Sequence, residues 1–382
     1  MKFLFASDSF KGSLTSEQTI ELLARAANDV FDDVTYEGVW VADGGEGTTE
    51  AVIHADNGKK IYTSVHGPLM EEEQAFFGVT GDKAILEMAA ASGLPMVPKD
   101  KRNPLYTTTY GTGELILAAI DKGYRDITIA LGGSATNDGG IGCLKALGVE
   151  FYDKDHQSLE GKGEDLIRIS HIDTSNMDKR LKECTFTIMS DVTNPLCGKD
   201  GATYTFGPQK GATDEILEQL EAGMCNYRDI IKKQFGIDCD TIPGTGAAGG
   251  LGAALTVFLH ASIKSGIQAV LDLIHFDDRL EGVDLVVTGE GRTDWQSCFG
   301  KVMQGVGLRA KKAGIPAVGL CGSLGKGAEQ IFDHGITSLI TTVNAPMSLD
   351  EAMENAESLY YLAAVRMFRM IQAGMQIQAN KN

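Results

Sequence analysis

The chain has 382 residues, of which 43% are hydrophobic and 23% are charged. This length and apolar content suit about two domains with buried cores, and they argue against intrinsic disorder. The 34 basic and 52 acidic residues give a formal net charge of −18. Such a charge repels nucleic acid and anionic lipid, so neither is an expected partner.

The N-terminal part of the chain alternates between predicted strands and helices. Residues Lys2–Ala6 are a predicted buried strand, and a helix is expected from Ser16 to Val30 because Thr15 and Gln18 have capping-box spacing. A second strand is predicted at Glu37–Ala42, before a short helix. This alternation predicts a βαβ unit with parallel strands.

The middle of the chain is more mixed. The segments Gln74–Val79 and Lys83–Met88 predict an antiparallel hairpin. Two further strands are expected at Ile127–Leu131 and Phe186–Ser190, and a long helix at Ala212–Gln234. These elements predict a mixed α/β arrangement.

The C-terminal part returns to the alternation of strand and helix. Strands are predicted at Val283–Thr288, Ala317–Cys321 and Ile336–Thr342, with a helix at Lys301–Ala313. Ser348 and Glu351 are expected to cap one long final helix. Its apolar face is predicted to carry Tyr361, Leu362, Val365 and Phe368.

We therefore expect an α/β fold of two domains, with the active-site cleft between them. One domain is predicted from both ends of the chain, residues 1–66 plus 281–382, as a parallel sheet with helices on both faces. Residues 67–280 are the expected inserted domain of mixed α/β structure.

The seven cysteines bear on the cellular compartment. Their number is odd, they are dispersed, and no C-x-x-C motif occurs. The spacing predicts neither a disulfide framework nor a zinc site, and reduced thiols favour a cytoplasmic protein. No run reaches the roughly 18 apolar residues of a membrane span, and the first residues are too short an apolar run for a signal peptide.

Six loops that contain acidic residues, several glycines or both stand near the ends of predicted elements. They are Asp8–Ser13, Asp43–Thr48, Gly132–Gly140, Asp191–Pro195, Gly244–Gly250 and Thr288–Asp294. Glycine lets backbone N–H groups approach an anion, and carboxylates suit a hard cation such as Mg²⁺. Ligands of open α/β sheets bind beyond the carboxyl ends of the strands, so the loops are predicted to meet in one cleft and to handle phosphate through a metal. Each loop also has a purely structural interpretation, as a turn, a helix cap or an internal salt bridge.

One glycine pattern supports an alternative function. Gly244, Gly246 and Gly249 form a G-x-G-x-x-G match, and Asp272 lies about 20 residues further on, as in dinucleotide-binding folds. The preceding segment 238–243 is a poor strand. An NAD(P)-dependent hydroxy-acid dehydrogenase is therefore the second hypothesis, and a non-catalytic binder of small sugar acids is the third. No Walker A motif is present.

Eight motifs, taken in order, resemble those of the bacterial glycerate kinases of the first type. They are Asp8–Ser16, Val41–Thr48, Tyr110–Glu114, Gly132–Gly140, Ser190–Gly198, Phe206–Gly211, Pro243–Gly252 and Thr288–Asp294. The resemblance implies an ATP-dependent kinase of D-glycerate, with 2-phosphoglycerate as the expected product and 3-phosphoglycerate less expected. It also implies two α/β domains, one of them Rossmann-like, with a cleft between them. Whether the protein forms a homodimer is left open by the resemblance.

The chemistry of the loop residues predicts their roles in such a reaction. ATP phosphates are expected on Gly132, Gly133, Ser134, Asn137, Gly244, Thr245 and Gly246, and Mg²⁺ on Asp43, Glu46 and Asp191. D-Glycerate is expected on Asp8, Ser9, Lys11, Arg292 and Asp294. The predicted catalytic residues are Lys11 and Arg292, which would neutralise the moving phosphoryl group, and Asp191, which could accept the hydroxyl proton instead of binding metal.

Overall fold

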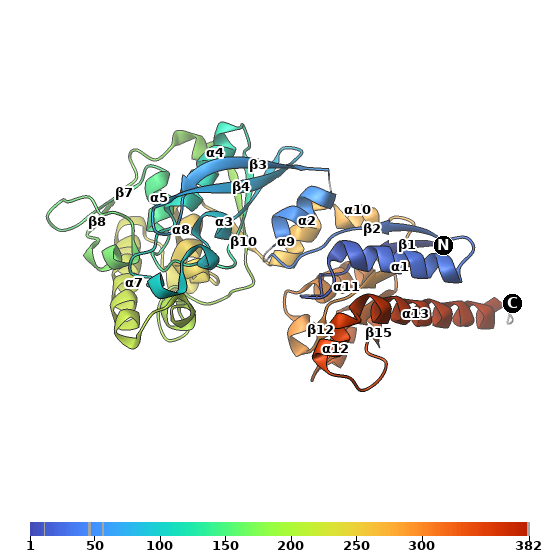
Figure 1. Cartoon of the computed structure of the whole chain (residues 1–382). Coiled ribbons are helices and arrows are strands. Elements are labelled where there is room, and N and C mark those ends of the chain that lie inside the picture. Colours follow the sequence, from blue (N-terminus) through green and yellow to red (C-terminus); the bar gives the residue numbers. More distant parts are fainter. Residues whose placement is uncertain (11, 45–46, 56, 380–382) are drawn as a thin grey trace. The chain divides into compact units, whose positions relative to one another are not determined.

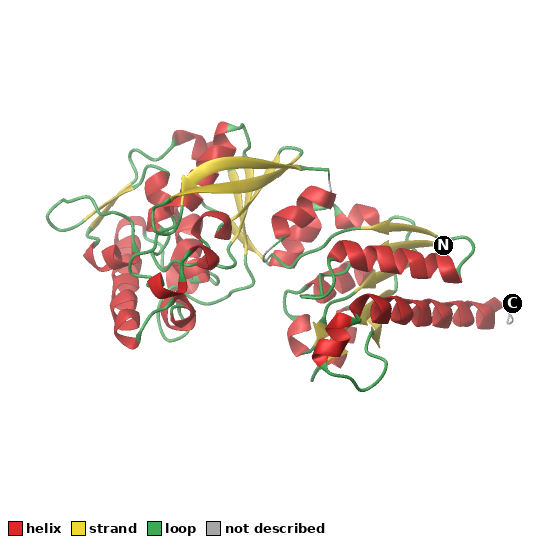
Figure 2. Cartoon of the chain, in the orientation of Figure 1, coloured by secondary structure: helices red, strands yellow, loops and turns green. Residues whose placement is uncertain are grey.

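The computed structural model describes residues 1–10, 12–44, 47–55 and 57–379 (Figure 1). The chain forms two compact units, which we call the first unit (Met1–Asp43 with Gly266–Asn382) and the second unit (Gly44–Ser265). Both units mix helices with strands, as the α/β prediction requires (Figure 2). Residues 44–66, which were expected in the domain built from both ends of the chain, belong to the second unit. Residues 266–280, which were expected in the inserted domain, belong to the first unit.

A five-stranded sheet forms the centre of the first unit. Its order is β15-β13-β11-β1-β2 and every neighbouring pair is parallel. The strands are β1 (Lys2–Phe5), β2 (Thr35–Gly38), β11 (Leu285–Thr288), β13 (Ala317–Cys321) and β15 (Ile336–Thr341). The chain adds β2 on one side of β1 and the later strands on the other, so the strand order reverses between β1 and β11. Ligands of such sheets bind beyond the carboxyl ends of the strands at this reversal.

Helices cover both faces of this sheet. α1 (Ser16–Val30) and α13 (Ala356–Ala379) lie side by side (Figure 1) and bury one face, in a core that contains Phe3, Phe5 and Phe368. α11 (Val302–Ala313) packs on the opposite face, against β11 and β13, and on α9 (Gly266–Leu273). The contact with α9 explains why residues 266–280 join the first unit. The remaining elements are α10 (Phe276–Arg279), β12 (Arg292–Thr293), β14 (Ser323–Leu324), α12 (Leu349–Glu354) and the 3₁₀ helices η8 (Trp295–Cys298) and η9 (Ala328–His334).

Two predictions about the first unit need correction. β2 ends at Gly38, because its partner β1 ends at Phe5, opposite Gly38. The final helix is two helices: α12 begins with the predicted Ser348–Glu351 capping box and ends before Asn355, where α13 follows. On α13 the buried side chains include Tyr360, Ala364, Met367 and Phe368, whereas Leu362 is 47% exposed.

A six-stranded mixed sheet forms the centre of the second unit, in the order β10-β9-β6-β5-β4-β3. Its strands are β3 (Lys59–His66), β4 (Glu72–Thr80), β5 (Lys83–Glu87), β6 (Asp126–Ala130), β9 (Thr185–Met189) and β10 (Ser262–Lys264). β4 and β5 form the predicted antiparallel hairpin, and β3 pairs with β4, which places residues 44–66 in this unit. β5, β6, β9 and β10 run parallel, so their carboxyl ends share one edge.

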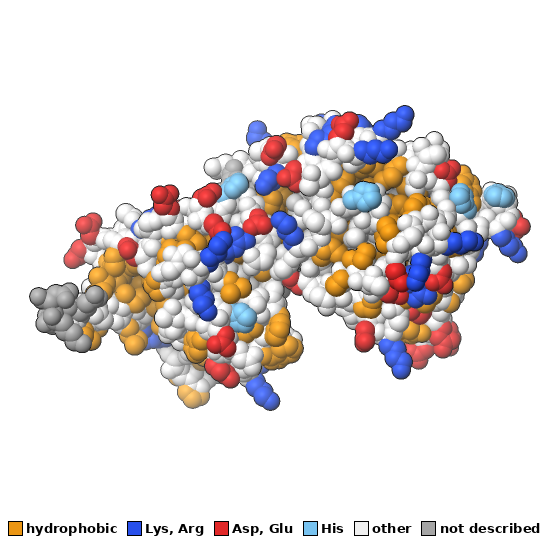
Figure 3. All heavy atoms as spheres, turned by 180° about the vertical axis from the view of Figure 1, so that it is seen from behind, with side chains coloured by type: hydrophobic (Ala, Val, Ile, Leu, Met, Phe, Trp, Pro, Cys, Tyr) orange, Lys and Arg blue, Asp and Glu red, His pale blue; other side chains and the backbone are white. Residues whose placement is uncertain are grey.

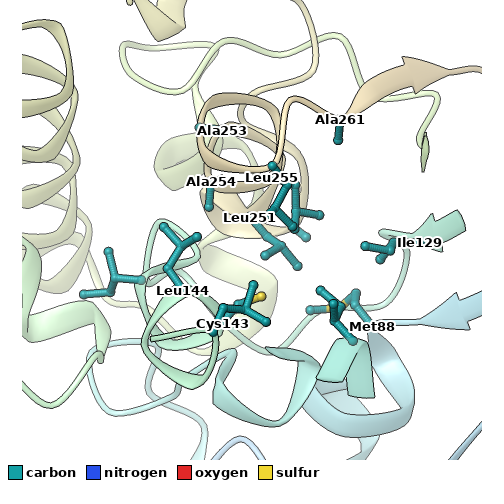
Figure 4. Close-up of a cluster of buried hydrophobic side chains, with 14 of the residues drawn as sticks. Met88, Ile129, Cys143, Leu144, Leu251, Ala253, Ala254, Leu255 and Ala261 are labelled. Carbon is teal, nitrogen blue, oxygen red and sulfur yellow. The ribbon is translucent and has the colours of Figure 1, made fainter. Parts of the chain in front are cut away.

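The core of the second unit lies between this sheet and several helices. Figure 4 shows Leu251 and Leu255 of α8 (Leu251–Phe258) close to Cys143 and Leu144 of α5 (Ile141–Ala146), with Met88 beside them. The helices are α2 (Thr48–Ala55), α3 (Ala89–Ser92), α4 (Tyr110–Asp121), α5 (Ile141–Ala146), α6 (Ala202–Phe206), α7 (Asp214–Phe235) and α8 (Leu251–Phe258). Two short strands, β7 (Glu150–Tyr152) and β8 (His171–Asp173), pair apart from the main sheet. Short 3₁₀ helices are η1 (Leu94–Met96), η2 (Lys99–Lys101), η3 (Gly163–Arg168), η4 (Lys179–Glu183), η5 (Pro208–Lys210), η6 (Cys239–Thr241) and η7 (Ala247–Gly250).

The surface carries both signs of charge. On the face shown in Figure 3, basic side chains are scattered among acidic ones and do not gather into one basic patch. Within the described residues, no helix combines the length and the apolar content that crossing a bilayer demands.

Candidate active site

A cavity of about 480 Å³ opens at the carboxyl edge of the parallel sheet in the first unit. We call it the first-unit cavity. Its lining comes from the ends of four of the five strands, including the two that flank the reversal of strand order. The polar and charged residues in this lining are Asp8, Ser9, Ser13, Asp43, Glu290, Arg292, Lys301, Ser323, Thr342 and Tyr360. The fold therefore places this cavity where open α/β sheets bind ligands.

The loop after β1 carries one carboxylate of the cavity, Asp8. The backbone amide of Asp8 donates to the carbonyl oxygen of Gly289 at 2.9 Å, which ties this loop to the loop after β11. The amide of Ser9 donates to Asp8 Oδ1 at 2.7 Å, and the Ser9 hydroxyl lies 3.5 Å from the same oxygen. These bonds fix the orientation of the Asp8 carboxylate toward the cavity.

The loop after β11 carries a second carboxylate, Glu290, which is only 7% exposed. It accepts hydrogen bonds from the hydroxyls of Thr293, at 3.0 Å, and Ser297. Burial raises the pKa of Glu290, while the two hydroxyls and the nearby charge of Lys301 oppose that rise. This carboxylate is thus a rigid part of the cavity wall.

Two cations line the same cavity. The side chain of Arg292 is 69% exposed, and its Nε lies 3.5 Å from Asp294 Oδ2. Asp294 itself caps η8, where Oδ1 accepts the amide of Gln296 at 2.9 Å, and it is not part of the cavity lining. Lys301 stands directly before α11. Lys301 was not predicted as a site residue, although a basic residue that follows a glycine and begins a predicted helix was a usable signal.

The residues predicted in the loops Asp8–Ser13 and Asp43–Thr48 have different outcomes. Asp43 lines the first-unit cavity together with Asp8 and Glu290. The predictions for Glu46 and Lys11 fall outside the described residues. Two partly exposed carboxylates, Asp8 and Asp43, line this cavity and offer oxygen atoms of the kind that Mg²⁺ prefers.

Two other predicted loops lie together at the carboxyl edge of the second sheet. Gly132 and Gly133 follow β6, and Asp191 follows β9, and these strands are parallel neighbours in which Ala130 pairs with Met189. Gly132, Gly133 and Asp191 are exposed. The N–H groups of Gly132 and Gly133 donate to no other described residue, so they can bind an anion.

The remaining nucleotide-binding candidates are buried. Asn137 is fully buried and donates to Thr203 Oγ1 at 3.1 Å. The hydroxyl of Thr245 is within hydrogen-bond distance of the carbonyls of Cys239 and Ile242. Ser134, Gly244 and Gly246 are buried as well.

The Gly244–Gly250 loop packs beneath the loop that carries Asp191. The amide of Gly246 donates to Asn194 O at 3.0 Å, and a Cβ on Gly246 would lie 2.2 Å from Pro195 O. These glycines therefore permit close packing of backbone against backbone. The segment before Gly244 contains the 3₁₀ helix η6 and no strand among the described residues, so the strand that a dinucleotide fingerprint requires does not precede these glycines.

Comparisons with known proteins identify the family of the chain. Residues 3–372 match the sequence profile of the glycerate kinase family. The chain is 44% identical to the glycerate 2-kinase of Escherichia coli K12, over 93% of this chain and 94% of that protein. It is 45% identical to a glycerate kinase of Bacillus cereus, over 94% of each chain. A crystal structure of a Salmonella typhimurium LT2 protein matches with a TM-score of 0.88 and 41% identity, covering 98% of this chain and 99% of that one.

The family match spans nearly the whole chain, and the relatives share its length. The resemblance inferred from the eight motifs is thereby confirmed at the level of the family. The chain belongs to the glycerate kinase family of enzymes.

Proposed function

We propose that this chain transfers the γ-phosphoryl group of ATP to D-glycerate in the cytoplasm, with 2-phosphoglycerate and ADP as products, and that it is of the first bacterial type. The family membership and the name of the Escherichia coli relative, a glycerate 2-kinase, support the reaction and its position. The observation that carries the proposal is the first-unit cavity, which two cations and two partly exposed carboxylates line together.

D-Glycerate is assigned to the first-unit cavity. Arg292 presents an exposed guanidinium that can hold a carboxylate through two parallel hydrogen bonds, and Lys301 adds a second positive charge. Asp8 and Ser9 supply an acceptor and a hydroxyl for the substrate hydroxyls. Local cations are needed because a protein of net charge −18 repels an anionic substrate. Lys11 is proposed to join them.

Mg²⁺ is assigned to carboxylates of the same loops. Asp43 and Asp8 would hold it in the first-unit cavity, and Glu46 is proposed as a further ligand. Bound there, the ion would neutralise charge on the phosphate oxygens of ATP. Asp191 is the alternative ligand, and if it does not bind the ion it accepts the proton of the attacking hydroxyl.

The phosphates of ATP are assigned to the carboxyl edge of the second sheet. The amides of Gly132 and Gly133 are exposed and donate to no other described residue, which is the condition for a backbone anion site. Ser134, Asn137, Gly244, Thr245 and Gly246 are proposed to support these loops by packing and not by direct contact with the nucleotide.

A coupled ADP-release assay tests the proposal. ADP should form only when D-glycerate, ATP and Mg²⁺ are all present, and chelation of Mg²⁺ should abolish it. ADP formation that ignores glycerate would contradict the assignment of the acceptor. Glycerate-dependent oxidation or reduction of a nicotinamide cofactor without ATP would support the dehydrogenase instead.

A further inference from the structure

Two thiols and one carboxylate of the second unit meet at a place to which no role is assigned above. Cys197 lies in the loop after β9, and Glu221 and Cys225 lie on α7. Their two Sγ atoms and one carboxylate oxygen all lie within 4.8 Å of one another. We call these residues the Cys197–Glu221–Cys225 cluster.

The fold holds this cluster from both sides. Glu221 and Cys225 are four residues apart on α7, so their side chains share one face of the helix. The amide of Gly198 donates to Glu221 Oε1 at 2.6 Å, and the amide of Cys197 donates to Asp240 Oδ1 at 2.9 Å. The loop is therefore fixed against α7 before any ligand binds.

One oxygen of the Glu221 carboxylate has no hydrogen-bond partner among the described residues. Glu221 is 9% exposed, and its Oε1 accepts from the Gly198 amide and from the Cys225 thiol at 3.6 Å. Its Oε2 is buried and accepts no hydrogen bond from any described residue. A buried carboxylate oxygen without a donor is costly. A cation beside it would remove that cost.

The ligand chemistry selects the kind of cation. Two sulfur ligands favour Zn²⁺ and other thiophilic metals over Mg²⁺ or Ca²⁺, and an acidic oxygen completes common zinc sites. Zn–S bonds of about 2.3 Å and Zn–O bonds of about 2.0–2.2 Å place ligand atoms of a tetrahedral site roughly 3.4–3.8 Å apart. The observed separations are within reach of that geometry through small side-chain rotations.

We propose that Cys197, Glu221 and Cys225 bind a Zn²⁺ ion through the two Sγ atoms and one carboxylate oxygen of Glu221, with water as the fourth ligand. The ion would link α7 to the loop that begins at Asp191. Burial raises the pKa of the Cys197 thiol, so binding must release its proton. The nearest basic side chain on α7, Arg228, is held by Asp229 and Asp240 at 2.8 and 2.9 Å.

The spacing of cysteines in the sequence did not reveal this site, because the ligands come from a loop and a helix. The full-length protein, freed of metal with a chelator and kept reduced, provides the test. Titration with Co²⁺ should produce a thiolate-to-metal charge-transfer band, and loading with Zn²⁺ should leave a stoichiometric amount after dialysis. Zn²⁺ should also raise the Tm of the metal-free protein.

Single substitutions separate the cluster from the other cysteines. Cys225→Ser should weaken Zn²⁺ binding by more than about 100-fold, because even partners outside the ligand shell contribute about 10–100-fold. Glu221→Gln keeps an acceptor for the Gly198 amide, so it should fold and yet lose most of the rise in Tm. Cys184→Ser is the matched control, because Cys184 is half-buried in the same unit and donates to Arg180 O; it should bind as the wild type does.

Three outcomes would overturn the proposal. The first is wild-type protein that shows no charge-transfer band and retains no Zn²⁺. The second is equal Zn²⁺ affinity in the wild type and in folded Cys225→Ser. The third is formation of a Cys197–Cys225 disulfide, seen as the loss of two hydrogens by mass spectrometry, in a protein that does not bind Zn²⁺ after reduction.

Discussion

Replacing Arg292 with methionine separates substrate binding from stability. The guanidinium is 69% exposed and its ion pair with Asp294 is 3.5 Å long, so the pair contributes at most about 1 kcal/mol to folding. Hydrogen bonds from a charged group to a bound carboxylate contribute about 1.5–3 kcal/mol each. The loss of one such bond corresponds to a KM for glycerate that is about 10–150-fold higher.

The assay is steady-state ADP release at varied glycerate and saturating ATP, with Tm measured in parallel. Arg369→Met is the matched control, because Arg369 is exposed on α13 in the same unit and does not line the cavity. It should leave KM unchanged. A folded Arg292→Met enzyme with the wild-type KM for glycerate would refute the assignment of Arg292 to the substrate carboxylate.

Three further predictions concern the second unit. Asp191→Asn should lower kcat by about 10²–10⁴-fold with little change in Tm, because the side chain is exposed; near-normal turnover would remove Asp191 from the mechanism. Gly249→Ala should reduce the unfolding free energy in urea by more than about 1 kcal/mol, because the φ of Gly249 is +65° and a Cβ there would lie 2.1 Å from Thr136 O. Gly236→Ala is the control: φ is +73° but no atom lies near the added Cβ, so this variant should reduce the unfolding free energy by less. Burial lowers the pKa of Lys210 to about 7 from 10.5, so between these values the unfolded chain binds a proton at this residue that the folded chain does not. Lys210 should therefore contribute up to about 1.4 kcal/mol per pH unit to a rise of the unfolding free energy with pH. Lys210→Met should lack this contribution, and equal pH slopes in the two proteins would contradict the lowered pKa.

The sequence predicted helices and strands well where their bounds depend on residues close to them in the sequence. The helix Ser16–Val30 has the expected bounds because Thr15 and Gln18 cap it through their own side chains. β3 was missed, since it is an edge strand with many exposed polar residues and it exists only because it pairs with β4. The end of β2 was missed for the same reason, because the length of its partner decides it.

In the candidate site, too, the positions of residues in loops could be predicted from the sequence, whereas their burial could not. Asp8, Ser9, Asp43 and Arg292 were predicted from loops at strand ends, and the structure brings them into one cavity because those ends share an edge of the sheet. Burial could not be predicted for Asn137 or Thr245, since it depends on which distant loop packs over each. Their buried positions distinguish these two supporting residues from Gly132 and Gly133, which are exposed.

The identity of the product tests the central claim most directly. NMR spectra of the reaction of D-glycerate with ATP and Mg²⁺ should show ADP and a phosphate ester on carbon 2 of glycerate. A phosphate ester on carbon 3, or ADP without any phosphorylated glycerate, would contradict the proposed reaction.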